Sequence, residues 1–189
     1  MQWKDSSQLS ASSLSKLSTF IDLILRWNAR INLTGYRRRE EIENLLVGES
    51  IVAAFALQKA GRLKPGTGIL DFGSGTGIPG LVWSMLDLSI DVTSLEIRQK
   101  KVAFQKEVVR GLGLKARIVL GRFPEAVLGD RFDLIVSRAI RFDSDVWEQG
   151  KVCLDPGGMF VRFAALGAKE SGWDSIPISE RTSLLVQSA

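Results

Sequence analysis

The sequence predicts an α/β protein in which a mainly parallel, Rossmann-like sheet carries helices on both faces and follows an N-terminal helical cap. From residue 68 onward, short apolar segments alternate with segments of helical periodicity, which is typical of parallel strands joined by helices. Before residue 68 the apolar residues follow helical spacing only. We therefore expect a helical cap over residues 1–67 and an α/β domain over residues 68–189, joined in one compact unit.

Length and composition point to a globular protein. A chain of 189 residues is long enough for one domain with an appendage, and 45% hydrophobic and 24% charged residues are ordinary values for such a domain. The longest wholly apolar run, Ile51–Leu57, is far shorter than the ~20 residues that a membrane span needs. The first ten residues lack the apolar core of a signal peptide. We expect a cytoplasmic protein without a membrane partner.

The chain contains no histidine and a single cysteine, Cys153. The usual ligand sets for zinc are therefore missing, and so are Ser–His and Cys–His nucleophiles. One cysteine cannot form a disulfide within the chain. We expect no metal and interpret Cys153 as a packing residue.

The elements follow from local patterns. Apolar residues recur at three- and four-residue steps from Leu14 to Ile31, as along one face of a helix. A second helical stretch runs from about Glu40 to Ala60, and Gly61 ends it. In the α/β domain we expect strands near Gly68–Phe72, Asp91–Leu95, Ala116–Leu120, Asp133–Val136, Met159–Phe163 and Ser183–Val186, and helices near Pro79–Leu86, Gln99–Leu112 and Ser144–Val152.

The segment Ile69–Gly80 carries the strongest chemical signal. An apolar strand ends in Asp71, glycines follow at positions 73, 75 and 77, and Pro79 stands where a first helical turn begins. Such glycines permit positive φ angles and let a ligand approach the main chain beside the N–H groups of a helix end. Glu96 ends the next strand, nineteen residues after Gly77, where a carboxylate can accept hydrogen bonds from both ribose hydroxyls. The pattern predicts a nucleoside-cofactor site, with a purely structural turn as the alternative.

The loop alone leaves the cofactor open. The spacing Gly75-x-Gly77-x-x-Gly80 also satisfies the dinucleotide fingerprint, so an NAD-linked oxidoreductase is one alternative. Hydride chemistry would need a proton donor, however, and the chain has no histidine and only one tyrosine, Tyr36, without an obvious Tyr–Lys pair.

Basic residues are concentrated in two regions. Of the formal net charge of +4, residues 1–68 contribute ten basic and six acidic side chains, whereas residues 69–189 hold fifteen of each. From Arg98 to Arg122, eight basic side chains stand beside one acid, Glu107. Such a run is a candidate footprint for a phosphate backbone, and a solvated helix face remains the alternative.

Several segments resemble known methyltransferases. The run from Asp71 through Gly77 resembles motif I of class I methyltransferases, whose cofactor is S-adenosylmethionine, and Leu154–Gly158 resembles their turn into the fifth strand. Four blocks taken in order resemble the bacterial 16S ribosomal RNA guanine-N7 methyltransferase family over nearly the full length. These blocks are Trp27–Thr34, the glycine loop running into Ile78-Pro79-Gly80, Lys100–Phe104 after Glu96, and Ser137-Arg138-Ala139.

The chain departs from that family's pattern at three places. Leu46 stands where the family usually has a histidine, and Glu49-Ser50 replaces an Asp-Ser pair. The family's Arg-x-Glu becomes Arg122-Phe123-Pro124-Glu125, and a lysine-glycine pair is missing near Ala164. These departures keep an alternative open, namely an RNA-binding paralogue that retains the cofactor loop without catalysis or with another substrate.

The resemblance implies that residues 68–189 bind S-adenosylmethionine and that the methyl group goes to N7 of a guanine in 16S ribosomal RNA, free or in the small subunit. Guanine N7 carries an in-plane lone pair and no proton, so the reaction needs no general base and we expect no catalytic residue. Catalysis would rest on proximity, in-line orientation and electrostatic stabilisation. The guanine must be unstacked or single-stranded to reach the methyl group.

The resemblance also implies roles for single residues. Alternatives stay open for several of them: Phe123 as core filling, Glu96 as an ordinary exposed acid at the strand end, Asn28 as a cap of the loop before Gly35, Arg138 as a solvent-exposed charge or a partner of Glu125, and Arg37-Arg38-Arg39 as a solvated loop. The expected cofactor-binding residues are Gly73, Gly75, Gly77, Ile78, Glu96, Phe123, Pro124 and Arg138, and the expected RNA contacts are Asn28, Arg37, Arg38, Lys100 and Lys101.

Overall fold

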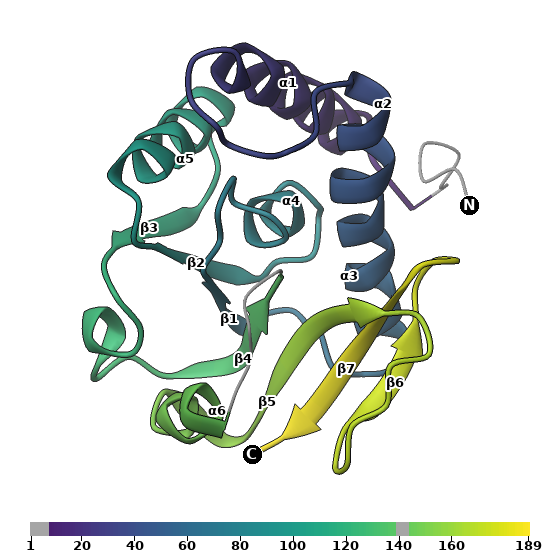
Figure 1. The fold of residues 1–189 in the computed structure, drawn as a ribbon, viewed down its shortest axis with the longest axis vertical. Coiled ribbons are helices and arrows are strands. Elements are labelled where there is room, and N and C mark those ends of the chain that lie inside the picture. The colour runs from purple at the N-terminus through teal and green to yellow at the C-terminus, as the bar shows by residue number, and fades with distance from the viewer. Residues whose placement is uncertain (1–7, 139–143) are drawn as a thin grey trace.

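The computed structural model describes residues 8–138 and 144–189 and contains a seven-stranded sheet in the order β3-β2-β1-β4-β5-β7-β6 (Figure 1). Strands β1 to β5 run parallel, whereas β7 is antiparallel to β5 and β6 is antiparallel to β7. The strands are β1 (Gly68–Phe72), β2 (Asp91–Glu96), β3 (Ala116–Leu120), β4 (Phe132–Ser137), β5 (Leu154–Ala165), β6 (Asp174–Pro177) and β7 (Thr182–Ser188).

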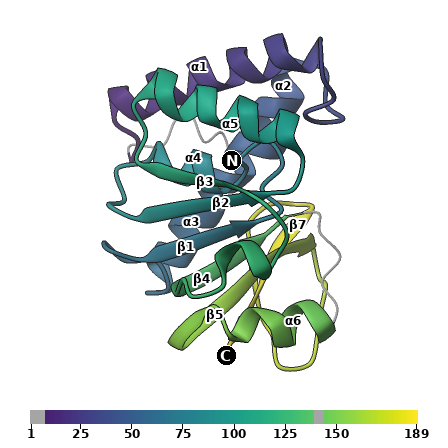
Figure 2. The same ribbon diagram turned by 90° about the vertical axis from the view of Figure 1, so that its left-hand side faces the viewer.

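Helices cover both faces of this sheet. Figure 2 shows α1, α4 and α5 on one side and α6 on the other. The helical elements are α1 (Ala11–Asn28), α2 (Arg39–Glu41), the π-helical segment η2 (Ile42–Gly48), α3 (Glu49–Lys59), α4 (Gly80–Ser84), α5 (Gln99–Leu112), the short 3₁₀ turn η3 (Glu125–Val127) and α6 (Ser144–Lys151).

Alternation along the strands creates two cores. In β1, Ile69 belongs to the larger core beneath the cap and α4, whereas Leu70 faces the smaller core on the other side. In β4, Leu134 belongs to the larger core and Ile135 to the smaller one. Successive side chains of a strand point to opposite faces, so near-continuous apolar strands bury both sides of a parallel sheet.

The cap joins the α/β domain through aromatic packing. Phe104 of α5 is fully buried, and its ring centroid lies 6.2 Å from that of Phe20 and 5.6 Å from that of Trp27, both on α1. The Trp27 indole Nε1 donates a hydrogen bond to Glu107 on α5 at 3.3 Å. Apolar residues of the cap and of the sheet therefore form one continuous core.

Most expected elements are present, with informative differences. The bounds of β1, β3 and α5 agree with the sequence patterns, whereas β6 has no counterpart among the expected strands. β6 is four residues long and pairs only with β7 at the sheet edge. Its sequence has no apolar alternation from which a strand could be predicted. The stretch Leu154–Gly158, expected as a turn, forms the irregular start of β5, where the register to β4 shifts.

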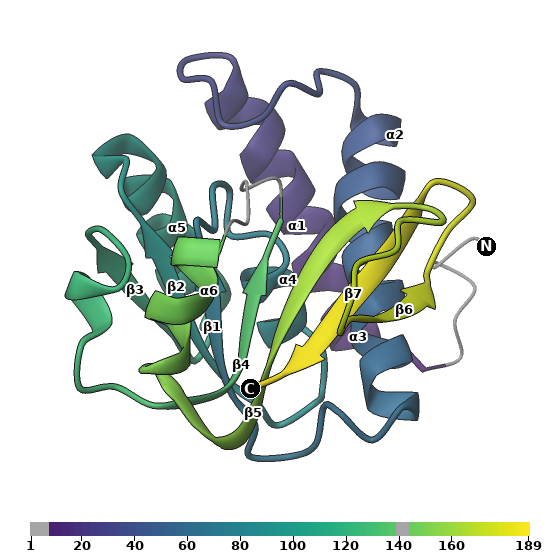
Figure 3. The same ribbon diagram turned by 60° about the horizontal axis from the view of Figure 1, so that its bottom comes forward.

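The C-terminal hairpin of β6 and β7 lies beside α3 (Figure 3), whereas the last residue, Ala189, donates a hydrogen bond to the Gly158 carbonyl in β5. The single helix expected over Glu40–Ala60 is a continuous helical stretch whose first half, η2, has π-helical hydrogen bonding. No helix within the described ranges combines the length and the apolar content that a membrane crossing requires.

Replacing Phe104 by alanine should lower the free energy of unfolding by about 3–5 kcal/mol, because the change leaves a cavity between α1 and α5. Urea titrations followed by circular dichroism and by tryptophan fluorescence should give coincident single transitions for the wild type and for Phe104→Ala. The exposed Lys106→Ala variant is the control and should stay within about 0.5 kcal/mol of the wild type. Two separate transitions would contradict the single compact unit.

Candidate functional site

A cavity of about 760 Å³ opens at the carboxyl ends of β1, β2, β3 and β4. The chain leaves β1 toward β2 on one side and returns to β4 on the other, so the cavity lies at the point where the strand order reverses. The glycine loop and the ends of β2 and β3 form most of the wall, and the cap closes it. The cap contributes Leu33, Thr34, Tyr36 and Leu46.

The glycine loop is held in place by its neighbours in the fold. The N–H groups of Gly73 and Ser74 donate to the carbonyl oxygen of Leu95 on β2, at 2.9 and 3.1 Å. The buried amide of Gln105 on α5 donates to the Gly75 carbonyl at 2.9 Å and to Ser74 Oγ at 2.8 Å. Gly73 and Gly75 have φ angles of 67° and 59°, which side chains with a Cβ rarely adopt.

Glu96 is buried at the end of β2 and lines the cavity. Its Oε2 accepts a hydrogen bond from the Gly75 N–H and its Oε1 accepts one from the Arg98 N–H, both at 2.8 Å. A carboxylate has about four acceptor positions, so the remaining lone pairs can accept hydroxyl groups. Lys101 stands on the same wall, and burial lowers the pKa of its ammonium group while the charge of Glu96 opposes that shift.

Asp71 fixes the exit of the glycine loop. Its Oδ2 accepts the Gly80 N–H at 2.8 Å, and burial raises the pKa of its carboxyl group to about 7, although this hydrogen bond and the positive charge of Arg138 oppose the shift. A Cβ at Gly80 would lie 2.8 Å from the Asp71 side chain, so only glycine fits there. Asp71 Oδ1 has no hydrogen-bond partner within the described part of the chain.

The β3 end of the cavity is aromatic. The rings of Phe72 and Phe123 lie 4.6 Å apart, and both line the cavity, so Phe123 is at once a packing residue and a wall residue. Ile97 is half exposed beside them. This end can hold a flat apolar group, while Glu96 offers acceptors next to it.

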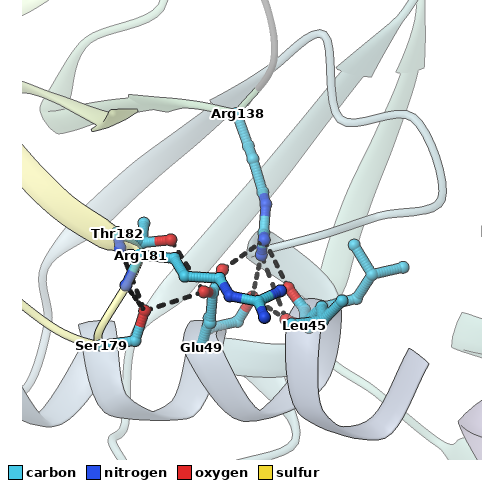
Figure 4. A network of polar contacts seen from close by, with 8 residues as sticks. Leu45, Glu49, Arg138, Ser179, Arg181 and Thr182 are labelled. Atoms are coloured by element: carbon cyan, nitrogen blue, oxygen red, sulfur yellow. Dashed lines mark hydrogen bonds and ion pairs between the residues drawn. The ribbon is translucent and has the colours of Figure 1, made fainter. Parts of the chain in front are cut away.

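Arg138 is anchored to the cap. Its guanidinium NH2 donates to Glu49 Oε2 at 2.6 Å and to the Leu45 carbonyl, and its NH1 donates to the Leu46 carbonyl at 3.2 Å and to Ser50 Oγ at 3.5 Å (Figure 4). Both carbonyls belong to η2. Pairing of Arg138 with Glu125 was one alternative, and Glu49 is the partner instead, because Glu49 is buried within reach of the end of β4.

Glu49 ties three separate segments together. Its Oε1 accepts hydrogen bonds from Ser179 Oγ at 3.0 Å and from Thr182 Oγ1 at 2.7 Å, while its Oε2 accepts Arg138 (Figure 4). Burial lowers the pKa of the Arg138 guanidinium, and the negative charge of Glu49 counteracts that shift. Leu46 and Glu49, two of the departures from the family pattern, therefore both contact Arg138.

Six of the eight expected cofactor residues line the cavity, and Gly77 and Pro124 do not. Gly77 has a φ angle of 81° and packs so closely on Leu81 that a Cβ would overlap that side chain. Pro124 is the residue immediately before η3. The six lining residues are Gly73, Gly75, Ile78, Glu96, Phe123 and Arg138.

The residues expected to contact RNA lie in different environments, and most of them do not line the cavity. Asn28 is buried, and its Oδ1 accepts the N–H groups of Leu33 and Thr34 while its Nδ2 donates to the Tyr36 carbonyl, at 3.0, 3.1 and 2.8 Å. Asn28 therefore takes the alternative role of a loop cap. Arg37 donates to the Asn28 carbonyl at 3.1 Å.

The other basic residues differ in exposure. Arg38 forms an exposed ion pair with Glu41 at 3.1 Å. Lys100 is exposed at the start of α5, and only Lys101 of the expected RNA set lines the cavity. Ala139, the last residue of the Ser137-Arg138-Ala139 block, lies outside the described residues.

Sequence reasoning missed Gln105 and the cap wall. Gln105 lies between Val102 and Val108 on the buried face of α5, so an amide in an apolar stripe was the available signal. Of the cap wall, Leu33 and Thr34 lie in the Trp27–Thr34 block and Leu46 was noted as a departure, but their place at the cavity was not predicted, because these residues approach the glycine loop only through the fold. Within residues 8–138 and 144–189, no three metal-ligating side chains cluster.

Comparison with known proteins gives a family. Residues 13–171 match the family described as rRNA small subunit methyltransferase G. The proteins named "Ribosomal RNA small subunit methyltransferase G" from Symbiobacterium thermophilum, Chromohalobacter salexigens and Geobacter metallireducens are 31%, 33% and 30% identical over 80%, 82% and 92% of this chain. The matches cover 63%, 71% and 77% of those proteins, so the chain spans about two thirds of the length of its relatives.

Solved structures agree on the fold. A mutant of MtNAS in complex with S-adenosylmethionine has a TM-score of 0.63 at 15% identity, covering 94% of this chain and 72% of that chain. A methyltransferase from Pyrococcus furiosus has a TM-score of 0.61 at 14% identity, covering 95% and 98%. The predicted fold, a Rossmann-like class I methyltransferase sheet with an N-terminal helical part, is confirmed.

Replacing Glu49 by glutamine should lower the free energy of unfolding by about 3 kcal/mol, because Arg138 is then buried beside a neutral partner. Their side chains are 9% and 17% exposed. The matched control Glu148→Gln alters a pair in which Glu148 is 66% exposed and should cost less than about 1 kcal/mol. Equal effects of the two substitutions in urea titrations would show that the Arg138 anchor adds nothing.

Proposed function

Because the chain belongs to the rRNA small subunit methyltransferase G family, we propose that it transfers the methyl group of S-adenosylmethionine to N7 of a guanine in 16S ribosomal RNA. The membership confirms the resemblance that the four sequence blocks indicated. One observation of the site carries the proposal: the glycine loop and the buried carboxylate of Glu96 meet on one cavity at the strand-order reversal.

The cavity has the chemistry that this cofactor requires. Glu96 offers acceptors for ribose hydroxyls, and Phe123 with Ile97 offers an apolar slot for adenine. Gly73 and Gly75 keep the wall free of side chains, since their positive φ angles exclude most other residues. The methionine part would lie toward Ile78 and the Arg138 side of the cavity. When bound, the cofactor supplies a methyl group on a positively charged sulfur.

The residues of this chain would bind, orient and exclude water rather than move protons. Guanine N7 has no proton to lose, and both carboxylate oxygens of Glu96 already accept backbone N–H groups. The chain has no histidine to act as a general base. Holding the two reactants in line converts a bimolecular encounter into a step within one complex, which can lower the barrier by about 7–11 kcal/mol.

Charge at the mouth of the cavity supports an RNA partner. Arg98, Lys101 and Arg122 line the cavity, and Lys100 is exposed beside them. Arg117, in contrast, lies in β3 and pairs with Asp130. The basic residues of the run therefore fall into two groups, and those that line the cavity would bind phosphate groups of the RNA. A ribosomal RNA substrate, free or in the small subunit, would be met in the cytoplasm.

Methyl transfer is tested with purified protein, tritiated S-adenosylmethionine and small ribosomal subunits or naked 16S RNA that lack the modification. After nuclease digestion, the label should elute with 7-methylguanosine. Binding without transfer would favour the non-catalytic paralogue, and label in another nucleoside would contradict the guanine-N7 assignment.

The variant Glu96→Gln should weaken cofactor affinity about tenfold or more, because one charged acceptor for the ribose is lost. Equilibrium dialysis with labelled cofactor measures this loss directly. Glu148→Gln, which changes an exposed glutamate on α6, serves as the control and should bind like the wild type. Equal cofactor affinities for the wild type, Glu96→Gln and Glu148→Gln would show that Glu96 does not bind the cofactor.

A further inference from the structure

We propose that Tyr36 is the surface on which the acceptor guanine stacks, so that the cap supplies the substrate half of the cavity. This inference rests on the proposed function and names the residue that receives its substrate. The cavity wall has two parts, one from the α/β domain and one from the cap. The loop after β1 and the ends of β2 and β3 offer the groups that a nucleoside cofactor needs, whereas the cap wall of Leu33, Thr34, Tyr36 and Leu46 remains unassigned.

The reaction itself dictates how the base must be held. The new bond forms between N7 and the methyl carbon as the sulfur–carbon bond breaks, and the electron pair of the broken bond stays on sulfur. The positive charge passes to the guanine ring, and no proton moves. Because the N7 lone pair lies in the ring plane, the base must present its edge to the methyl group and be held by its faces. A flat side chain beside the methyl position meets this requirement.

Tyr36 is the aromatic residue on the cap side of this wall. Among the described lining residues, the other aromatic rings are Phe72 at the end of β1 and Phe123 after β3, which pack against each other. Stacking of an unpaired base on an aromatic ring contributes about 1–3 kcal/mol. Leu33 and Leu46 supply apolar surface on the same wall.

Hydrogen bonds hold the backbone of Tyr36, and its side chain packs against the edge of the larger core. The Tyr36 carbonyl accepts the Asn28 amide at 2.8 Å, and its N–H donates to Thr34 Oγ1 at 3.3 Å. Asn28 also binds the N–H groups of Leu33 and Thr34, so the whole loop is fixed from the end of α1. The loop that carries the half-buried Tyr36 is thereby held at the cavity before any substrate arrives, which lowers the entropy cost of binding.

The proposed stack also favours the transition state over the ground state. As positive charge develops on the guanine, its attraction to the electron-rich face of a tyrosine ring increases, as in other cation–π contacts. Arg138 is a cation that lines the same cavity. Four protein acceptors already occupy the terminal N–H groups of Arg138, so its guanidinium is committed to the cap. The ring face of Tyr36 is then the part of this wall that can hold the base.

Kinetics of three variants test the inference. Tyr36→Leu should lower kcat/KM for the RNA roughly 5- to 150-fold, which corresponds to the loss of one stack, and should leave the KM for S-adenosylmethionine unchanged. Tyr36→Phe and Tyr36→Trp keep a ring and should restore most of the rate. A Tyr36→Leu enzyme with full kcat/KM, or a loss that Tyr36→Phe does not rescue, would overturn the inference.

A spectroscopic measurement is independent of turnover and of variant folding. Tyr36 is the only tyrosine of the chain, so uniform labelling with 3-fluorotyrosine gives one ¹⁹F resonance. In protein saturated with S-adenosylhomocysteine, 7-methylguanosine 5′-monophosphate should shift this resonance through its ring current, and uridine 5′-monophosphate should shift it less. A resonance that responds to S-adenosylhomocysteine alone would place Tyr36 at the cofactor and overturn the inference.

The two proposals fail in distinguishable ways. If the wild-type protein transfers no label to RNA or to subunits, the proposed function fails. If it transfers label to N7 and the Tyr36→Leu variant does so equally well, the function stands and the stacking role is wrong.

Discussion

The site depends on the fixed position of one peptide, the one that ends in Gly75. Its N–H is bound by the carboxylate of Glu96, and the next carbonyl along the chain is bound by the amide of Gln105. The backbone there takes a left-handed conformation and carries no side chain, so a ligand can approach the main chain itself. Because Glu96 also faces the cavity, the group that holds the loop is the group that would hold the ribose.

A second constraint closes the cavity from the cap side. In η2 the hydrogen bonds skip one residue more than in an α-helix, and the carbonyls of Leu45 and Leu46 accept the guanidinium of Arg138. π-Helical turns often mark functional sites, and here the turn receives a charged side chain from the end of β4. Glu49 extends the same contact to the turn before β7. The cap, the sheet and the C-terminal hairpin therefore share one buried network beside the site.

Sequence patterns predicted what is local along the chain. The glycine loop and Glu96 were found because each follows a strand whose apolar run is easy to recognise, and parallel strands bring their carboxyl ends together. The strand β6 was missed because an edge strand of four residues needs no apolar face. The partner of Arg138 was not predictable from spacing, since Glu49 is 89 residues away and enters through the packing of the cap. Tyr36 was noticed only as a lone tyrosine, because its place on the wall depends on the Asn28 clamp.

We propose that the glycine loop and Glu96 form a binding site for a sulfonium nucleoside. Isothermal titration calorimetry of the unmodified protein with S-adenosylhomocysteine, and separately with NAD, tests this claim most directly. We expect saturable binding of S-adenosylhomocysteine at one site per chain and no heat of binding with NAD. Saturation by NAD, or no binding of S-adenosylhomocysteine at millimolar concentration, would contradict it.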